Sequence, residues 1–134
     1  MNGIFVDTGG WYAAIDRKDR DHEAARRFLE KNSLPLITTD YVMDEIVTLL
    51  QVRLGHHYAM RFLDSLRASR LVQLVYLSQA QIEAAIELFR NRPDKDWSFT
   101  DCSSFVLMDE YSLRRALAFD DHLALWYFPV FTTY

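Results

Sequence analysis

The chain has 134 residues, half of them hydrophobic and a quarter charged, which fits one globular domain over residues 1–134 and excludes a disordered chain. Its formal net charge of −4 argues against attachment to nucleic acid by overall positive charge, although bound cations can reverse the local sign of an acidic site. The single cysteine, Cys102, excludes an internal disulfide and indicates a reducing, cytoplasmic setting. No signal peptide and no apolar run of about 18 residues is present, so we expect no membrane segment.

The N-terminal half alternates short apolar runs with helical patterns. In chain order it predicts a strand at residues 3–6, a short helix at 11–15, a helix at 21–31, a strand at 36–38, and helices at 41–54 and 57–68. The helix at 41–54 is the clearest, because its apolar side chains recur on one stripe.

The C-terminal half continues the alternation. It predicts a strand at residues 71–77, a helix at 81–91, a polar loop at 92–96, a helix from 98 or 100 through 108, a strand at 115–119, a short helix at 122–125 and a last strand at 129–132. The helix that ends near residue 108 is apolar nearly all round, so we expect it to be buried. Strands that alternate with helices predict a parallel sheet covered on both faces.

Four acidic residues stand out, two at the carboxyl ends of predicted strands, where such a sheet collects its sites, and two on or near buried helix faces. Asp7 follows the first predicted strand, and Asp120 follows the fourth. Asp101 lies near the start of the buried helix. Glu45 borders the buried stripe of its own helix, whereas Asp44 faces away. We therefore expect the four carboxylates to converge.

Carboxylates that converge need protons or cations to relieve their mutual repulsion. Two of them about 5 Å apart repel by roughly 3 kcal/mol at an effective dielectric constant of about 20. Protons or bound cations must relieve this repulsion, and oxygen ligands suit Mg²⁺ or Mn²⁺. The adjacent pair His56–His57 does not have the spacing of a zinc site.

Each acid also has a structural interpretation. Asp7 could cap the helix that follows it, and Asp120 could be a turn residue. Glu45 could be an ordinary paired helix residue. Asp101 could complete a capping box with Ser98, with Asp in place of the usual Glu. The metal-site interpretation depends on all four acids together.

Four segments resemble, in order, the sequence motifs of PIN domains. They are residues 5–11, 39–45, 97–108 and 118–122. The third is the most specific, and the resemblance extends over nearly the whole chain. It is closest to the VapC-type toxin ribonucleases of prokaryotic toxin–antitoxin pairs. Gly9 and Gly10 depart from the Ser or Ala that is common there, which predicts a looser turn after Asp7.

The resemblance implies a PIN-like three-layer α/β/α sandwich with a central, mainly parallel sheet of four to five strands. It implies Mg²⁺ or Mn²⁺ dependence, an RNA substrate, an antitoxin protein that blocks the acidic cleft, and a homodimer formed through the helices between residues 41 and 68. It assigns catalysis and metal binding to Asp7, Glu45, Asp101 and Asp120, with Thr8 and Asp121 as secondary candidates.

The expected reaction is hydrolysis of an RNA phosphodiester bond, in which one or two cations lower the pKa of the attacking water. The products would carry 5′-phosphate and 3′-hydroxyl ends. An inactive RNA-binding module is an alternative, and so is another metal-dependent phosphoryl enzyme such as a phosphatase. A phosphatase that forms a phospho-enzyme usually has a second acid two residues after the first, where this chain has Gly9.

Overall fold

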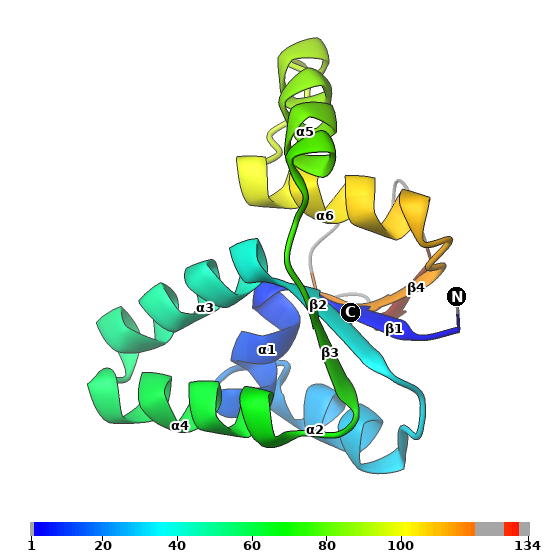
Figure 1. Cartoon of the computed structure of the whole chain (residues 1–134). Coiled ribbons are helices and arrows are strands. Elements are labelled where there is room, and N and C mark those ends of the chain that lie inside the picture. Colours follow the sequence, from blue (N-terminus) through cyan, green and yellow to red (C-terminus); the bar gives the residue numbers. More distant parts are fainter. Residues whose placement is uncertain (1, 120–127, 132–134) are drawn as a thin grey trace.

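The computed structural model describes residues 2–119 and 128–131. Five strands form one sheet, and they are β1 (Ile4–Val6), β2 (Leu36–Thr39), β3 (Val72–Val75), β4 (Arg115–Leu117) and β5 (Phe128–Phe131). Their order in the sheet is β3-β2-β1-β4-β5, and every neighbouring pair is parallel (Figure 1). The predicted parallel sheet of four to five strands is therefore confirmed.

The central strand is β1. Ile4 pairs with Leu36 of β2 on one side, and Phe5 pairs with Ala116 of β4 on the other. All three residues of β1 are fully buried, as expected for an apolar strand covered on both faces. Because β2, β1 and β4 are parallel neighbours, their carboxyl ends lie side by side at one edge of the sheet.

The described residues form six helices beside the sheet. They are α1 (Thr8–Ile15), α2 (His22–Lys31), α3 (Asp40–Arg53), α4 (His56–Ala68), α5 (Gln79–Asn91) and α6 (Phe99–Glu110). Helices α1 and α2 cover one side of the sheet and α6 covers the other, while α5 packs on α6 and stands away from the sheet (Figure 1). The three-layer α/β/α arrangement is thus present. The helix predicted at residues 122–125 lies outside the described residues.

Most element boundaries lie within one or two residues of the predicted ones, and at two of those that differ a side chain bonds to the backbone. Helix α1 begins at Thr8 rather than residue 11, since the Asp7 carboxylate accepts a hydrogen bond from the Gly10 N–H and caps the helix. Strand β3 ends at Val75 rather than residue 77, since the Leu77 N–H donates to a side chain of another element instead of a sheet neighbour. Neither bond can be read from hydrophobic periodicity.

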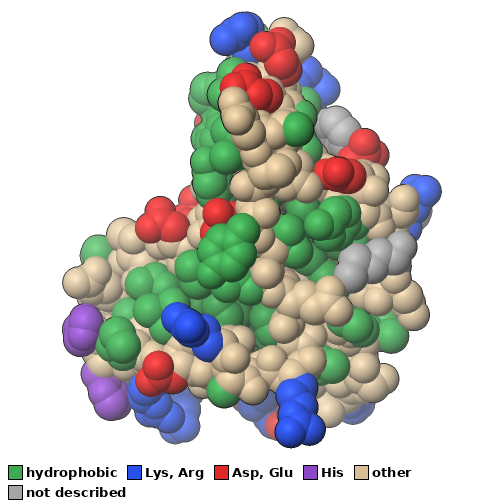
Figure 2. Space-filling view, in the orientation of Figure 1, with side chains coloured by type: hydrophobic (Ala, Val, Ile, Leu, Met, Phe, Trp, Pro, Cys, Tyr) green, Lys and Arg blue, Asp and Glu red, His purple; other side chains and the backbone are tan. Residues whose placement is uncertain are grey.

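Helix α6 is buried nearly all round, as predicted. Cys102, Leu107 and Met108 are fully buried, and Phe105 is 1% exposed. The ring of Trp97 packs edge-on against Phe105, with 4.9 Å between centroids. Figure 2 shows that hydrophobic side chains also reach the surface along the projection that α5 forms and at its base.

Candidate active site

Asp7 lies where β1 ends and α1 begins, at the carboxyl edge of the sheet. Its Oδ1 accepts the Gly10 N–H at 2.7 Å, and its side chain is half-buried. The capping interpretation is therefore confirmed. Capping does not exclude metal binding, because an ionised carboxylate has two oxygens and about four lone-pair sites.

The turn after Asp7 is closely packed rather than loose. A Cβ atom on Gly10 would lie 2.2 Å from the carbonyl oxygen of Leu117, a distance that real Cβ atoms do not reach. Glycine at this position lets α1 approach β4. The expectation of a looser turn was wrong, because the missing Cβ at Gly10 allows close packing of the backbone and does not loosen the chain.

Glu45 is brought to the same place from another element. The Thr8 hydroxyl donates a hydrogen bond to Glu45 Oε1 at 2.6 Å, which joins the first turn of α1 to α3 across 37 residues of sequence. Both side chains are half-buried. Thr8, a secondary candidate from the sequence, here holds a Glu45 oxygen, and it is the residue that directly follows Asp7.

Thr38 supports this corner of the site, although no pattern in the sequence singles it out as functional. Its buried hydroxyl donates to the carbonyl oxygen of Val6 and accepts the Trp11 indole N–H, at 3.1 and 3.2 Å. It therefore holds the end of β1, the neighbouring strand and α1 together next to Asp7. A threonine inside a fully buried strand is the signal that could have revealed it, because its hydroxyl needs a partner there.

Asp101 lies in the first turn of α6 and is half-buried. Its Oδ2 accepts the Ser98 N–H at 2.9 Å, and its own N–H donates to the Ser98 hydroxyl at 3.0 Å. This pair of bonds is a capping box, so that interpretation of Asp101 is also confirmed. The bonds fix the direction of the Asp101 carboxylate relative to the helix start.

The structure brings some of the predicted site residues together, and others lie outside the residues that it describes. Within residues 2–119 and 128–131, no group of three or more His, Cys, Asp or Glu side chains is arranged to hold a metal ion. Glu45 meets Thr8, and Asp101 bonds to the start of its own helix. Asp120 and Asp121 lie outside the described residues. The four-acid metal site therefore stays a prediction.

Two other residues lie near the acids in the sequence, and Asp44 faces away as predicted. Asp44 is exposed, and Cys102 is fully buried in the core. Burial raises the pKa of the Cys102 thiol, and the neighbouring Asp101 carboxylate raises it further. A thiol that stays protonated in the core is a packing residue and not a nucleophile.

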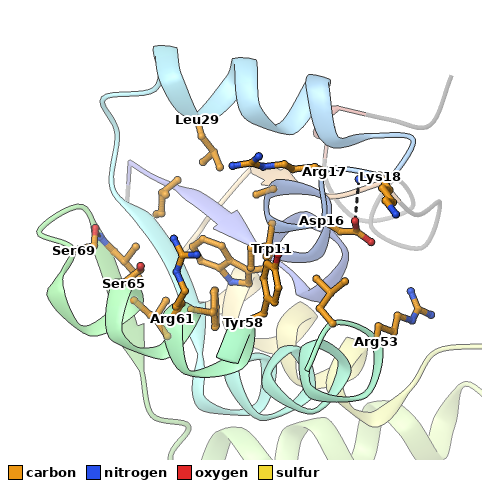
Figure 3. A pocket seen from close by; sticks show the side chains of 17 residues that line it. Trp11, Asp16, Arg17, Lys18, Leu29, Arg53, Tyr58, Arg61, Ser65 and Ser69 are labelled. Atoms are coloured by element: carbon orange, nitrogen blue, oxygen red, sulfur yellow. Dashed lines mark hydrogen bonds between the residues drawn. The ribbon is translucent and has the colours of Figure 1, made fainter. Parts of the chain in front are cut away.

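A cavity of about 990 Å³ lies on the α1 side of the sheet, between α1, α2 and α4 (Figure 3). Its floor is apolar and includes Trp11, Phe62 and Leu66. The cations that line it are Arg17, Lys18, Arg53 and Arg61. Figure 3 shows Arg17 reaching over the cavity from the segment after α1, while Arg61 rises from α4 beside Trp11. None of the described acidic site residues lines this cavity.

Comparison with known proteins decides the family. The family model of the PIN domain matches residues 4–128. The chain belongs to the PIN-domain family. The matched span contains all four predicted acids, so the resemblance of the motifs is confirmed at the level of the family.

The relatives of this PIN domain include toxin ribonucleases. It is 32% identical over 117 residues to the 23S rRNA-specific endonuclease VapC20 of Mycobacterium tuberculosis, which covers 87% of this chain and 88% of the relative. It is 26% identical to ribonuclease VapC26 of the same organism, over 87% of this chain and 86% of that protein. The crystal structure of Mycobacterium tuberculosis VapC20, described as a sarcin-ricin loop cleaving toxin, matches with a TM-score of 0.86 at 29% identity, covering 92% and 94% of the two chains.

In the part of this PIN domain that the structure describes, no helix is long and apolar enough to cross a membrane.

Proposed function

We propose that this PIN domain is a metal-dependent endoribonuclease and the toxin of a type II toxin–antitoxin pair. The observation that carries the proposal is its relationship to VapC20, which is named as an rRNA endonuclease and is similar over 87% of this chain. The site supports it, because Asp7 follows the central strand and Glu45 is tied to the neighbouring residue Thr8.

The donor atoms fit a hard divalent cation. The candidate ligands Asp7, Glu45, Asp101 and Asp120 all offer carboxylate oxygens, which suit Mg²⁺ or Mn²⁺ better than zinc or copper. When bound, such a cation would lower the pKa of a water molecule and offset the charge of the scissile phosphate.

The residues of the chain itself would orient the acids. The Gly10 N–H holds Asp7, the Ser98 N–H holds Asp101, and the Thr8 hydroxyl holds Glu45. Each of these three acids thus has one oxygen fixed by a donor, which reduces the reorganisation needed when substrate binds. In this proposal RNA is the substrate, with its phosphate facing the carboxyl edge of the sheet.

The experiment is an RNA cleavage assay on the purified chain with ribosomal RNA and a stem-loop RNA, in Mg²⁺, in Mn²⁺ and in EDTA. We expect cleavage only with a divalent cation, and products with 5′-phosphate and 3′-hydroxyl ends. Asp7→Asn should abolish cleavage, while the matched change Asp44→Asn on an exposed acid should not. Ends with 2′,3′-cyclic phosphate, or cleavage that persists in EDTA, would contradict the proposal. RNA binding without cleavage in any cation would favour the inactive RNA-binding module.

The antitoxin is a further part of the proposal, and the cavity beside α1 supports a protein partner. Its apolar floor and its four cations suit an acidic, amphipathic segment. Co-expression with the product of the neighbouring gene should yield a complex in which cleavage is inhibited. Arg61→Glu should weaken that complex and leave cleavage by the free toxin unchanged.

A homodimer and a cytoplasmic setting complete the proposal. The helices between residues 41 and 68 expose apolar side chains at Val52, Tyr58 and Met60, and such side chains are buried in many dimer interfaces. Light scattering of the purified chain should give twice the chain mass, and Met60→Glu should shift the measured mass toward that of the monomer.

The cytoplasmic setting is supported by the single buried thiol, Cys102.

A further inference from the structure

One hydrogen bond joins the start of α3 to the point where the chain leaves the sheet for α5. The Leu77 N–H donates to Asp40 Oδ1 at 3.1 Å, across 37 residues of sequence. Asp40 is the first residue of α3 and follows β2 directly, and Leu77 stands between β3 and α5. The bond therefore anchors the base of the α5 projection to the carboxyl edge of the sheet.

The next residue, Tyr41, makes a second contact, with α6, on which α5 packs. The ring of Tyr41 packs against Phe99, the first residue of α6, with 6.1 Å between centroids. Phe99 in turn contacts Phe89 of α5, at 6.0 Å. Two consecutive residues of α3 thus make contacts at two separate points, the segment that leads into α5 and the first residue of α6.

The acids of the candidate site lie close in sequence to these contacts. Glu45 is one helical turn after Tyr41, on the same face of α3. Asp101 is two residues after Phe99, in the first turn of α6. A shift of α6 against α3 at the Tyr41–Phe99 contact would therefore move Asp101 relative to Glu45.

The bond between Asp40 and Leu77 is not needed to start either α3 or α5. Thr39 already caps α3, since its hydroxyl accepts the Val42 N–H. Ser78 caps α5 through a capping box with Gln81. The Asp40 carboxylate is thus directed to a neighbouring element instead of its own helix, which is the behaviour of a connecting residue.

We propose that Asp40 and Tyr41 form a joint that sets the position of Asp101 relative to Glu45, and thereby the affinity of the site for its cation and the rate of cleavage. This rests on the proposed ribonuclease function. Both are positioning residues, since they act through Leu77 and Phe99 and not on the substrate. The joint explains how acids on two different helices hold one geometry.

The first test compares Asp40→Ala with Asp40→Asn, because an Asn oxygen still accepts the Leu77 N–H and an Ala side chain cannot. In Asp40→Ala we expect kcat on RNA to fall about 10- to 100-fold with KM for RNA unchanged, and the Mn²⁺ concentration for half-maximal rate to rise about 10- to 100-fold. Asp40→Asn should stay near the unmodified protein. Asp64→Ala, the same change at an exposed acid of α4, is the matched control.

Tyr41 offers a second pair, should Asp40→Ala fold poorly. Tyr41→Ala removes the ring and should behave as Asp40→Ala, while Tyr41→Phe keeps the ring and should restore both kinetic parameters. The joint is overturned if Asp40→Ala and Tyr41→Ala keep the original kcat and Mn²⁺ dependence. It is also overturned if Asp40→Asn loses as much as Asp40→Ala, because charge rather than hydrogen bonding would then be the cause.

Hydrogen exchange on the chain without RNA separates this proposal from the ribonuclease proposal. In Asp40→Ala the amide of Leu77 and those of residues 98–104 should exchange faster, and in Asp40→Asn they should not. A chain that cleaves no RNA but shows this exchange pattern would refute the nuclease function and keep the joint. A chain that cleaves RNA, with exchange in Asp40→Ala unchanged, would refute the joint alone.

Discussion

Gly10 approaches Leu117 so closely that a Cβ atom would lie 2.2 Å from the Leu117 carbonyl oxygen. The same glycine donates its N–H to the Asp7 carboxylate at 2.7 Å. One residue therefore sets both the distance between α1 and β4 and the position of the first acid of the candidate site. A change that moves α1 away from the sheet must also move the group that holds Asp7.

We expect Gly10→Ala to lower the free energy of unfolding by about 1–3 kcal/mol or more, since the clash is with backbone that can shift only with its strand. RNA cleavage should fall as well, because the donor to Asp7 is displaced. Urea denaturation and the cleavage assay measure the two effects.

Gly9→Ala is the matched control for that substitution. Gly9 is exposed in the same helix, and a Cβ atom on it would lie 3.6 Å from Asp7 Oδ1, which is an ordinary contact. Alanine there should be neutral or add up to about 1 kcal/mol through its higher helix propensity. Equal losses at both glycines would show that close packing on β4 is not the cause.

The Thr8 hydroxyl gives a second prediction. Thr8→Val keeps the shape of the side chain and removes the donor to Glu45. A hydrogen bond to a charged group contributes about 1.5–3 kcal/mol, so the affinity for Mn²⁺, measured by calorimetry, should fall about 10- to 100-fold. Thr8→Ser retains a hydroxyl and should bind Mn²⁺ nearly as well as the unmodified chain. Undiminished affinity in Thr8→Val would mean that Glu45 is held by other groups.

The fold could be predicted because its signals are local. The short apolar run before Asp7 predicts a covered strand, and the strand–helix alternation predicts a parallel sheet. The positions of Asp7 and Asp101 followed from the same pattern. Both proved to be capping residues, and their role in a metal site stays a prediction.

What could not be predicted depends on contacts between residues distant in sequence. The bond from Leu77 to Asp40 and the bonds of Thr38 join elements that only the folded sheet brings together. The close approach of Gly10 to β4 also appears only in three dimensions, so two adjacent glycines were misread as a loose turn. Periodicity reports which face of an element is buried, and it contains no information about which partner the element meets.

The two capping boxes allow a comparison within one molecule. Ser98 caps α6 and bonds to Asp101, whereas Ser78 caps α5 and bonds to Gln81. Each Ser→Ala change should cost about 1 kcal/mol of unfolding free energy, typical of a lost N-cap. Only Ser98→Ala should also slow RNA cleavage, since only that cap orients a site acid. If Ser78→Ala slowed cleavage equally, helix stability and not the orientation of Asp101 would explain the loss.

The last prediction concerns the dependence of stability on pH. Asp16 accepts the Tyr12 hydroxyl at 2.6 Å and the Lys18 N–H at 2.9 Å. These bonds, that from Tyr12 foremost, hold the pKa of Asp16 below its usual value. A carboxyl whose pKa is depressed in the folded state stabilises the fold above its unfolded pKa of about 4. That contribution is lost as the pH falls through the lower folded value.

At alkaline pH the same pair acts through Tyr12. Burial, and secondly the bond to Asp16, raises the pKa of Tyr12 above its usual value. Its contribution is therefore complete below about pH 10 and is lost as the pH rises through the folded pKa. Tyr12→Phe should flatten both limbs of a plot of unfolding free energy against pH, measured by urea denaturation. Tyr58→Phe, the same change at an exposed tyrosine, should leave both limbs as they are. An acid limb unchanged in Tyr12→Phe would show that the Lys18 N–H alone suffices to keep Asp16 ionised.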